Sequence, residues 1–450
     1  MPEPMSSSAS SVSTMDSKKL ERPWRFSDKT MEVAAARSIY LKIFMGGAFM
    51  TIVTIFAVFS IFWGSLWKIP AHNLHGWVVD FDEGTIGQGV AQALGAQPAG
   101  SRITWTVVPA SQFPGGPPQL GRDVLEEHTW VAVAINPGAT ARLTASISSP
   151  NSSYDGTEAI TVYATEARNE NAFRGLIRPS VQATLEVVSR AIAIQTARRV
   201  ATAQNLGQLL TTSPQTVTAP VGYRIQNMAP FDQPVASAVT FVGLLYQLIL
   251  SFFIVMIGLS AREVSGFERS LSTWSLIKLR LVSSFAAYFV IALFYSLLSL
   301  AFQLNVSRKF GHSGFLIFWM LNYAGMLAVG LALESLLTLL TTRGIPFFML
   351  TWIITNVSVC VYPIEVMPHI FRYGHAAPFY NVSRAMRAII FSTKNVVGQT
   401  FGILAAWIAI SCITLPLIQI AIRRRQAKGT TNPKASTPEV VHPSNEKNPA

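Results

Sequence analysis

Cysteine is scarce in this chain. Only Cys360 and Cys412 occur among its 450 residues, and both lie in long apolar stretches. The more polar region 68–236 has none, so no disulfide can hold it together. With about 170 residues it is long enough to bury a core of its own. We therefore expect it to fold by apolar packing, and cysteine usage gives no indication of the compartment.

Catalytic motifs are also missing. The sequence contains no GxxxxGK(S/T) phosphate loop, no HExxH or GxSxG motif and no paired-cysteine metal motif. We therefore expect no ATPase in this chain, no enzymatic activity, no cofactor and no metal. Two groups leave a cation site open: His72 with His75, and the acidic turn of Asp80, Asp82 and Glu83. Polar residues at the mouth of a span and a turn that ends a strand explain them more simply.

Acidic residues are outnumbered. The chain has 23 Asp and Glu against 35 Lys and Arg, a net charge of +12. Such an excess is typical of nucleic-acid-binding proteins. Here, however, the basic residues gather at the ends of apolar stretches, as the positive-inside rule of membrane proteins predicts. We therefore expect membrane lipid, and not nucleic acid, as a partner.

Apolar stretches are what the sequence has in abundance. Half of its residues are hydrophobic, and a helix needs about 20 apolar residues to cross a bilayer. Six segments meet this requirement: 43–67, 237–260, 281–303, 315–340, 345–362 and 401–422. The fifth is the weakest, because Thr351, Thr355, Asn356 and Ser358 dilute it. The first is too long for a cleaved signal peptide, and we expect it to act as a signal anchor.

The spacing of these segments predicts a polytopic α-helical membrane protein with six spans. A cytosolic tail over 1–42, with a short interfacial helix near its end, precedes the first span at 43–67. A folded extracytosolic domain is predicted at 68–236. The five-span bundle follows at 237–422, and a disordered cytosolic tail is predicted at 423–450.

The basic residues predict the orientation. They cluster before the first span, after the last, between the second and third and between the fourth and fifth: Lys18, Lys19, Arg22, Arg25, Lys29, Arg37, Lys42, Arg423, Arg424, Arg425, Lys428, Arg262, Arg269, Lys278, Arg280 and Arg343. With six spans these regions share one side, which the rule makes the cytosol, together with both termini. The sequon at Asn151 is then a candidate glycosylation site on the outside. Residues 363–400 disagree, because they would lie outside and yet carry Arg372, Arg384, Arg387 and Lys394.

Within the region 68–236, short β-rich runs alternate with helical patterns. Strands are predicted at 77–79, 103–108, 130–135 and 159–163. Helices are predicted over 120–128 and over 171–206, the second interrupted by Pro179. The pattern indicates an α/β or α+β domain whose long helices return toward the membrane.

Glu334 is the one clear acid within a predicted span. Charges inside a membrane are costly and commonly functional, which favours a substrate path or a proton-linked site. The alternative is an acid near the cytosolic end of the span that pairs with Arg343 or another bundle residue. Ala324, Ala328 and Ala332 form a small-residue stripe on the same helix, which is typical of helix packing.

Three stretches together resemble a known family. The run before the last span resembles the signature that precedes the final helix of ABC type-2 exporter membrane domains, through Met367, Pro368, Pro378, Tyr380, Ala385 and Arg387. Residues 73–82 and 154–160 complete the pattern. With the layout of one span plus five, they are similar to the fungal nitrosoguanidine-resistance family, which is related to phage-infection-type membrane proteins. The resemblance covers roughly residues 35–425.

The resemblance implies a fungal, multi-pass protein of the plasma membrane or an endomembrane. It implies an association with resistance to toxic small molecules and with phospholipid asymmetry, and it transfers no catalytic residues. In the exporter superfamily the cytosolic connection between the second and third spans contacts an ATPase. That implies a docking surface here, at Arg262, Glu263, Phe267, Glu268 and Arg269. A basic loop that attracts anionic lipid is the alternative.

Transport or export of a drug or lipid across the membrane is the function we expect first. A partner, such as an ABC ATPase, would supply the energy. The alternative is a protein that does not transport, either a regulator of phospholipid asymmetry or a membrane-protein scaffold. The expected partners are lipid, that ATPase or another membrane protein, and a second copy of the chain.

Overall fold

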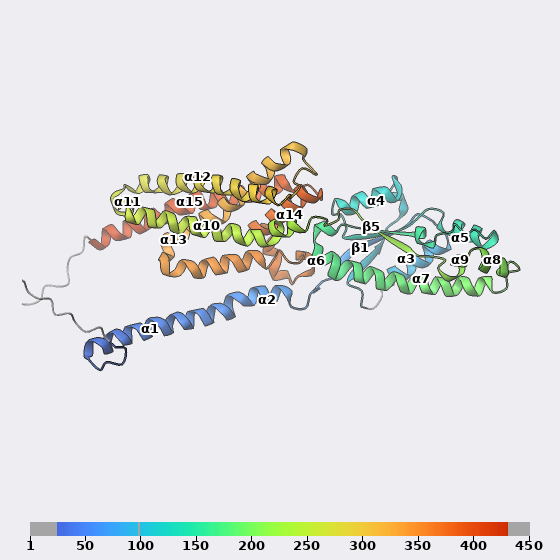
Figure 1. Ribbon diagram of the computed structural model, residues 1–450, viewed down its shortest axis with the longest axis horizontal. Coiled ribbons are helices and arrows are strands. Elements are labelled where there is room, and N and C mark those ends of the chain that lie inside the picture. Colours follow the sequence, from blue (N-terminus) through green and yellow to red (C-terminus); the bar gives the residue numbers. More distant parts are fainter. Residues whose placement is uncertain (1–24, 98–99, 431–450) are drawn as a thin grey trace, which may run out of the picture. The chain divides into compact units, whose positions relative to one another are not determined.

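A computed structural model describes residues 25–97 and 100–430 (Figure 1). The chain divides into two compact units, Met1–Ala57 and Val58–Ala450, which are described separately. In the first unit, helix α1 covers Met31–Thr54. It begins within the predicted interfacial segment, so most of that segment and the first predicted span belong to one helix. The predictions for residues 1–24 and 431–450 lie outside the described residues.

The second unit contains a sheet domain. Its strands are β1 (Leu74–Asp80), β2 (Ile103–Val107), β3 (Val131–Ile135), β4 (Ile160–Ala164) and β5 (Tyr223–Asn227). They form one five-stranded sheet in the order β2-β1-β3-β4-β5. All neighbours are parallel except the antiparallel pair β3 and β4. The first four strands lie where the sequence predicts them, whereas the polar β5 carries no such signal.

Both faces of the sheet are covered by helices. Successive strand residues point to opposite faces, so Val78 joins one core and its neighbour Val79 the other. The first core is covered by α3, α5 and α7, and the second by α4 (Figure 1). The helices between the strands are α3 (Thr85–Gly95), α4 (Gly116–Leu125), α5 (Ala139–Ser148), α6 (Glu170–Ala172), α7 (Arg178–Val200), α8 (Leu206–Thr212) and α9 (Gln215–Thr218).

Pro179 does not break the long helix as predicted. It is the second residue of α7, at the point where the helix passes from π-helical to α-helical hydrogen bonding. A π-helical turn over Phe173–Ile177 precedes it. The predicted helix 171–206 is therefore a short turn followed by one long helix.

The rest of the second unit is helical. After α2 (Ser60–Leu66), the bundle contains α10 (Gly243–Val264), α11 (Phe267–Ser270), α12 (Thr273–Ala301), α13 (Gly314–Val357), α14 (Pro378–Phe391) and α15 (Val397–Thr430). Among the described residues, five helical stretches are long and apolar enough to cross a membrane: Met31–Leu66, Pro234–Val264, Thr273–Ala301, Gly311–Val357 and Val397–Ala427. Because α15 continues to Thr430, the start of the predicted disordered tail is helical.

The fourth and fifth predicted spans both fall within α13. Its backbone breaks at Thr341, which has φ 60° and ψ 176°, a conformation that a β-branched residue rarely adopts. Before the break Thr338 lies near Gln419 of α15, since both accept hydrogen bonds from Arg280. After it, Trp352 contacts Trp407 of the same helix, with ring centroids 5.2 Å apart. Trp407 precedes Gln419 by about three turns, so the chain reverses direction at Thr341.

Polar residues in the bundle join its helices. Gln247 of α10 donates to Asn322 of α13, and Asn322 donates to Ser296 of α12 at 2.8 Å. Ala328, from the small-residue stripe, is completely buried. A side chain at the neighbouring Gly330 would collide with the ring of Tyr288. These contacts are those of helix packing.

Candidate functional site

The acid predicted within a span lies at the end of the bundle away from the sheet domain. Glu334 of α13 is 2% exposed, and its Oε1 accepts a hydrogen bond from Nε of Arg280 on α12 at 2.6 Å. Arg280 is 1% exposed and also donates to the Glu334 carbonyl, the Thr338 hydroxyl and the Gln419 side-chain oxygen. These hydrogen bonds replace the water that a charged guanidinium would otherwise require.

A second arginine extends this network. Arg262 of α10 is 6% exposed, and its Nη2 lies 3.1 Å from Oε1 of Glu334. Its Nε donates to the Glu268 carboxylate at 3.1 Å. Arg423 of α15 donates to the backbone carbonyls of Glu268 and Leu271. We call Arg262, Glu268, Arg280, Glu334 and Arg423 the distal cluster.

A cavity of about 550 Å³ opens beside the distal cluster. Pockets that hold small molecules commonly measure ~300–1,000 Å³. Its wall combines the cluster residues other than Glu334 with hydroxyls, such as Thr338 and Thr342, and with the apolar side chains of Leu259, Leu337 and Ile422. The strained Thr341 lies in the same wall. The cavity is therefore polar on part of its surface and apolar on another, which suits an amphiphilic molecule.

The structure shows which bundle residues pair with the predicted acid. Arg343 is exposed, and the carboxylate of Glu334 pairs with Arg262 and Arg280, as the alternative of another bundle residue allowed. The sequence had indicated Arg280 only as a basic residue at a span end, and Arg262 also as a docking residue. A basic residue just inside an apolar helix is the signal that could have found Arg280, because burial there requires an acid.

The predicted docking surface divides into two groups. Arg262 is buried and belongs to the distal cluster, so it is not part of an exposed surface. Glu268 is half-buried and pairs with it. Glu263, Phe267 and Arg269 are exposed. Contact between these residues and an ATPase stays a prediction.

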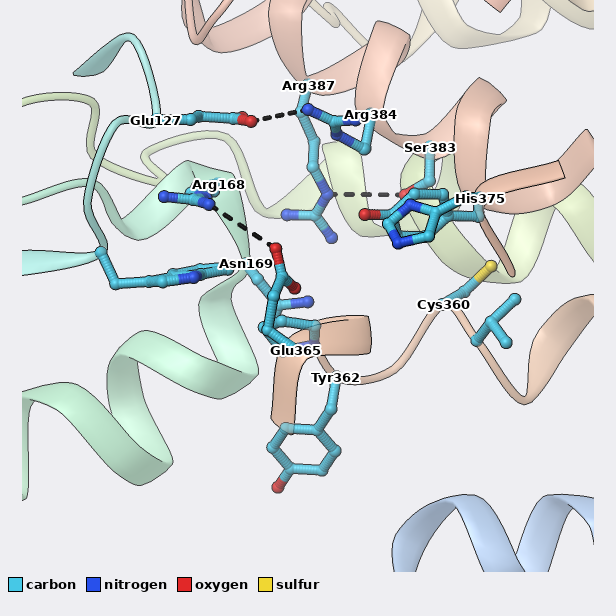
Figure 2. A pocket seen from close by; sticks show the side chains of 14 residues that line it. Glu127, Arg168, Asn169, Cys360, Tyr362, Glu365, His375, Ser383, Arg384 and Arg387 are labelled. Carbon is cyan, nitrogen blue, oxygen red and sulfur yellow. Dashed lines mark hydrogen bonds and ion pairs between the residues drawn. The ribbon is translucent and has the colours of Figure 1, made fainter. Parts of the chain in front are cut away.

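Charged side chains also gather where the sheet domain meets the bundle (Figure 2). Arg384 of α14 donates to Glu127 of the domain at 2.6 Å, and Arg387, one turn further along, pairs with Glu170. In the opposite sense, Arg168 of the domain lies 3.9 Å from Glu365 of the bundle segment. We call these six residues the junction. Each of its ion pairs joins two parts of the chain that are far apart in sequence.

The junction excludes most water. Arg168 stacks on Trp130, 3.4 Å from the ring centroid, and donates to the Thr129 carbonyl. Burial lowers the pKa of Arg168, and the Glu127 and Glu365 carboxylates oppose that shift. Burial would raise the pKa of Glu170, but the charge and hydrogen bond of Arg387 outweigh it and leave that pKa below its usual range.

Little space is left between these side chains. The junction surrounds a cavity of about 100 Å³, which Figure 2 shows between Arg168, Arg387 and Cys360. That volume holds only a few water molecules. Arg387 fills much of the gap, since it also donates to the Ala167 carbonyl at 3.2 Å. The junction thus leaves much less free space between domain and bundle than the distal cavity has.

The segment that carries the exporter-like signature supplies the bundle side of the junction. Met367 and Ala385 are buried, Pro378 starts α14, and Tyr380 lies beside Arg384. The domain residues Glu127, Arg168 and Glu170 were not predicted. Their sequence gives little signal, because exposed and paired charges look alike in a single chain.

The comparisons with known proteins cover both regions. Residues 47–413 match a family described as "Protein of unknown function (DUF3533)". The chain belongs to this family. A DUF3533 match of this extent includes the junction and most of the distal cluster, although it ends before Gln419 and Arg423.

One relative carries a printed location. An uncharacterized endoplasmic reticulum membrane protein of Saccharomyces cerevisiae is 27% identical over 326 residues, or 70% of this chain. The match spans 63% of the relative, slightly less than two thirds of its length. No solved structure matches the chain. The relative's name and the apolar helices support a membrane protein for this DUF3533 chain, and five such helices among the described residues are consistent with several spans.

Other sequence-predicted residues lie apart from both sites. Asn151 is exposed in a loop of the domain, where its side chain accepts hydrogen bonds from Ser153, and its glycosylation stays a prediction. The Asp82 carboxylate accepts a hydrogen bond from the Thr140 backbone amide at the start of α5. The Asp80 carboxylate accepts hydrogen bonds from the backbone amides of Asp82 and Glu83. These contacts are those of a turn that ends a strand.

Proposed function

We propose that this protein moves an amphiphilic small molecule, a drug or a lipid, across its membrane, without an ATPase of its own. The observation that supports this function is the distal cluster, which places Arg262, Arg280 and Glu334 inside an apolar bundle next to a cavity of about 550 Å³. Buried charges are costly in a membrane and commonly line substrate paths. A purely structural bundle would bury apolar side chains at lower cost.

We propose six spans with both termini on the cytosolic side. The reversal at Thr341 supports this count, because it divides the fourth apolar stretch into two antiparallel helices. The segment 342–357 measures about 24 Å as a helix, and residues up to 362 extend it across a hydrocarbon core of about 30 Å. Two of the four basic residues that disagree with an outer location, Arg384 and Arg387, are held in ion pairs with acids of the domain. Arg372 and Lys394 still count against it.

A tag at the C-terminus tests this topology. We expect the tag to resist protease in sealed vesicles whose cytosolic face points inward, and to be digested once detergent is added. A tag inserted at Asn151 in the exposed domain loop is the matched control and should be digested at once. Digestion of both tags in sealed vesicles would contradict six spans.

The setting of this function follows from two similarities. The resemblance to the nitrosoguanidine-resistance family favours a role in resistance to toxic small molecules. The yeast relative's name supports an endomembrane such as the endoplasmic reticulum over the plasma membrane. Loss of the protein should therefore sensitise cells to toxic compounds, and a fluorescent fusion should label an internal membrane.

Flux in a purified system tests the proposal directly. We would reconstitute the protein into vesicles that contain a fluorescent phospholipid and add a quencher that cannot cross the membrane. Transport predicts that lipid of the inner leaflet also becomes quenched, and a parallel assay follows release of a trapped toxic compound. If neither molecule moves, with or without added ATPase, the proposal fails. Altered lipid asymmetry in cells without flux in vesicles would instead favour the non-transporting regulator.

A further inference from the structure

The distal cavity carries more guanidinium than carboxylate. Four arginines line it, Arg262, Arg269, Arg280 and Arg423, against two acids, Glu263 and Glu268. Glu334 is not part of the wall but pairs with Arg262 and Arg280, so that one positive charge remains in excess when it is counted as well. The excess is concentrated on particular residues. Glu334 and Glu268 form ion pairs with Arg262 and Arg280, whereas Arg423 donates hydrogen bonds to neutral backbone carbonyls.

Arg423 and Arg269 are therefore the groups that remain for a ligand. Arg269 is exposed at the cavity, and Arg423 is half-buried in its wall. Guanidinium groups bind phosphate through two parallel hydrogen bonds, which a neutral carbonyl partner does not replace. The hydroxyls of Thr338 and Thr342 in the same wall add further hydrogen-bonding groups.

The apolar part of the wall indicates what the phosphate is attached to. Leu259, Leu337 and Ile422 lie on three different helices, α10, α13 and α15, that form the same cavity. A free inorganic anion gains nothing from such surface, whereas burial of the CH₂ groups at the start of an acyl chain is stabilising. The cavity combines a site for an anionic group with a site for hydrocarbon.

We infer that the distal cavity binds the phosphate headgroup of an anionic phospholipid, with Arg423 and Arg269 as its ligands. The inference rests on the proposed function, because it names the class of amphiphile that enters the path. Arg280 and Glu334 then form a fixed ion pair beside the site, and their charges already neutralise each other. The charge of Arg423 and Arg269 is the part that the lipid satisfies.

Binding of a short-chain lipid tests the inference without requiring flux. The probe is dihexanoyl phosphatidic acid, titrated into detergent-purified protein, with dihexanoyl phosphatidylcholine and inorganic phosphate as comparison ligands. We expect phosphatidic acid to bind most tightly. Arg423→Gln and Arg269→Gln should each weaken it about tenfold, the loss of one charge-assisted contact.

The chain offers a matched control for charge. Arg424 is adjacent to Arg423 on α15 but exposed and outside the cavity wall, so Arg424→Gln removes the same charge and should leave affinity within about twofold. Equal weakening by Arg424→Gln would show general surface attraction and overturn the site. Arg423→Lys retains the charge, and its unfolding temperature shows whether the contact with Glu268 and Leu271 is needed for folding. If Arg423→Gln does not fold, the affinity of Arg269→Gln for phosphatidic acid decides whether the site exists.

The remaining outcomes are also decisive. Inorganic phosphate that binds as tightly as phosphatidic acid would assign the site to a free anion and overturn the lipid. Absence of binding by every probe would overturn the site altogether. Affinity and flux are measured separately, so the two proposals can fail independently. Binding of phosphatidic acid without flux would reject transport and retain the headgroup site. Flux together with unchanged affinity in both variants would reject the headgroup site and retain transport.

Discussion

The junction and the distal cluster are built from the same two residue types but differ in how their charges are balanced. At the junction, three arginines meet three glutamates across the contact between domain and bundle, and about 100 Å³ of space remains. The distal cavity of about 550 Å³ is lined by four arginines and two glutamates, and Glu334 beside it pairs with two of those arginines. Complete pairing around little free space suits a structural contact, whereas surplus charge beside a large cavity suits a ligand.

The junction and the distal cluster also differ in which parts of the protein they connect. The junction pairs residues of two folded parts, and its backbone contacts include Ala71 N–H to the Val366 carbonyl at 2.8 Å. The distal cluster joins helices of one bundle through side chains alone or through loop carbonyls. Loss of junction pairs should therefore loosen the domain, and loss of distal charges should change what the bundle can bind.

The largest expected effect is that of Arg280→Met. It leaves Glu334 with only the longer contact to Arg262, and removal of one partner from a buried pair costs about 3–5 kcal/mol. We expect a large drop in the unfolding temperature of the detergent-purified protein. The control is Lys278→Met, an exposed basic residue on the same helix. Equal unfolding temperatures of the two variants would mean that the ion pair of Arg280 does not stabilise the protein.

A smaller effect is expected from Arg387→Met at the junction. Glu170 keeps 16% side-chain exposure and can recover some water, so the loss should be about 1–3 kcal/mol. Hydrogen exchange should rise in α6 and in α14, while α10 and α12 remain protected. Arg372→Met, an exposed change in the neighbouring segment, should leave the pattern unchanged. Uniform exchange throughout the bundle would show that the junction is no separate contact.

The pH dependence of the junction follows from Glu170. Because its pKa is lower in the folded protein than in the unfolded chain, its contribution to stability is fully present above about pH 4.3 and disappears as the pH falls through the folded value. The protection of the α14 amides, which relates their exchange rate to that of the unfolded chain at the same pH, should therefore decrease below about pH 4. Glu170→Gln should exchange faster at neutral pH and lose most of that dependence. An unchanged pH profile in the variant would assign the titration to another group.

The smallest effect is predicted for Glu365→Gln. Its contact with Arg168 is 3.9 Å long and its side chain is 46% exposed, so water screens the pair and the change should cost less than about 1 kcal/mol. Arg168 retains Trp130 and the Thr129 carbonyl. A loss as large as that of Arg387→Met would place this pair at the centre of the junction.

The sequence predicts the parts of this protein that follow from local pattern. Four strands and the apolar helices follow from runs of β-branched or apolar residues, and Glu334 follows from the cost of an acid in a span. The partner of Glu334 does not, because Arg280 lies 54 positions earlier and only helix packing brings it near. The reversal at Thr341, by contrast, lies at the turn that the sequence predicts between the apolar segments 315–340 and 345–362.

The positive-inside rule takes no account of tertiary pairing. Arg384 and Arg387, which the rule counts against an outer location of residues 363–400, are both paired with acids of the domain. Their partners Glu127 and Glu170 are more than 200 positions away, at separations of 257 and 217. A single sequence gives no means to match such distant charges.

Paired neutralisation tests the central distinction between the two sites. Arg280→Gln with Glu334→Gln removes the distal pair without leaving an unpaired charge, and Arg384→Gln with Glu127→Gln makes the same change at the junction. Lipid flux would be measured in vesicles that contain equal amounts of folded protein. We predict that the distal double variant loses most of its flux and that the junction double variant retains it. Full flux in a folded distal variant would contradict the assignment of the distal cluster to function.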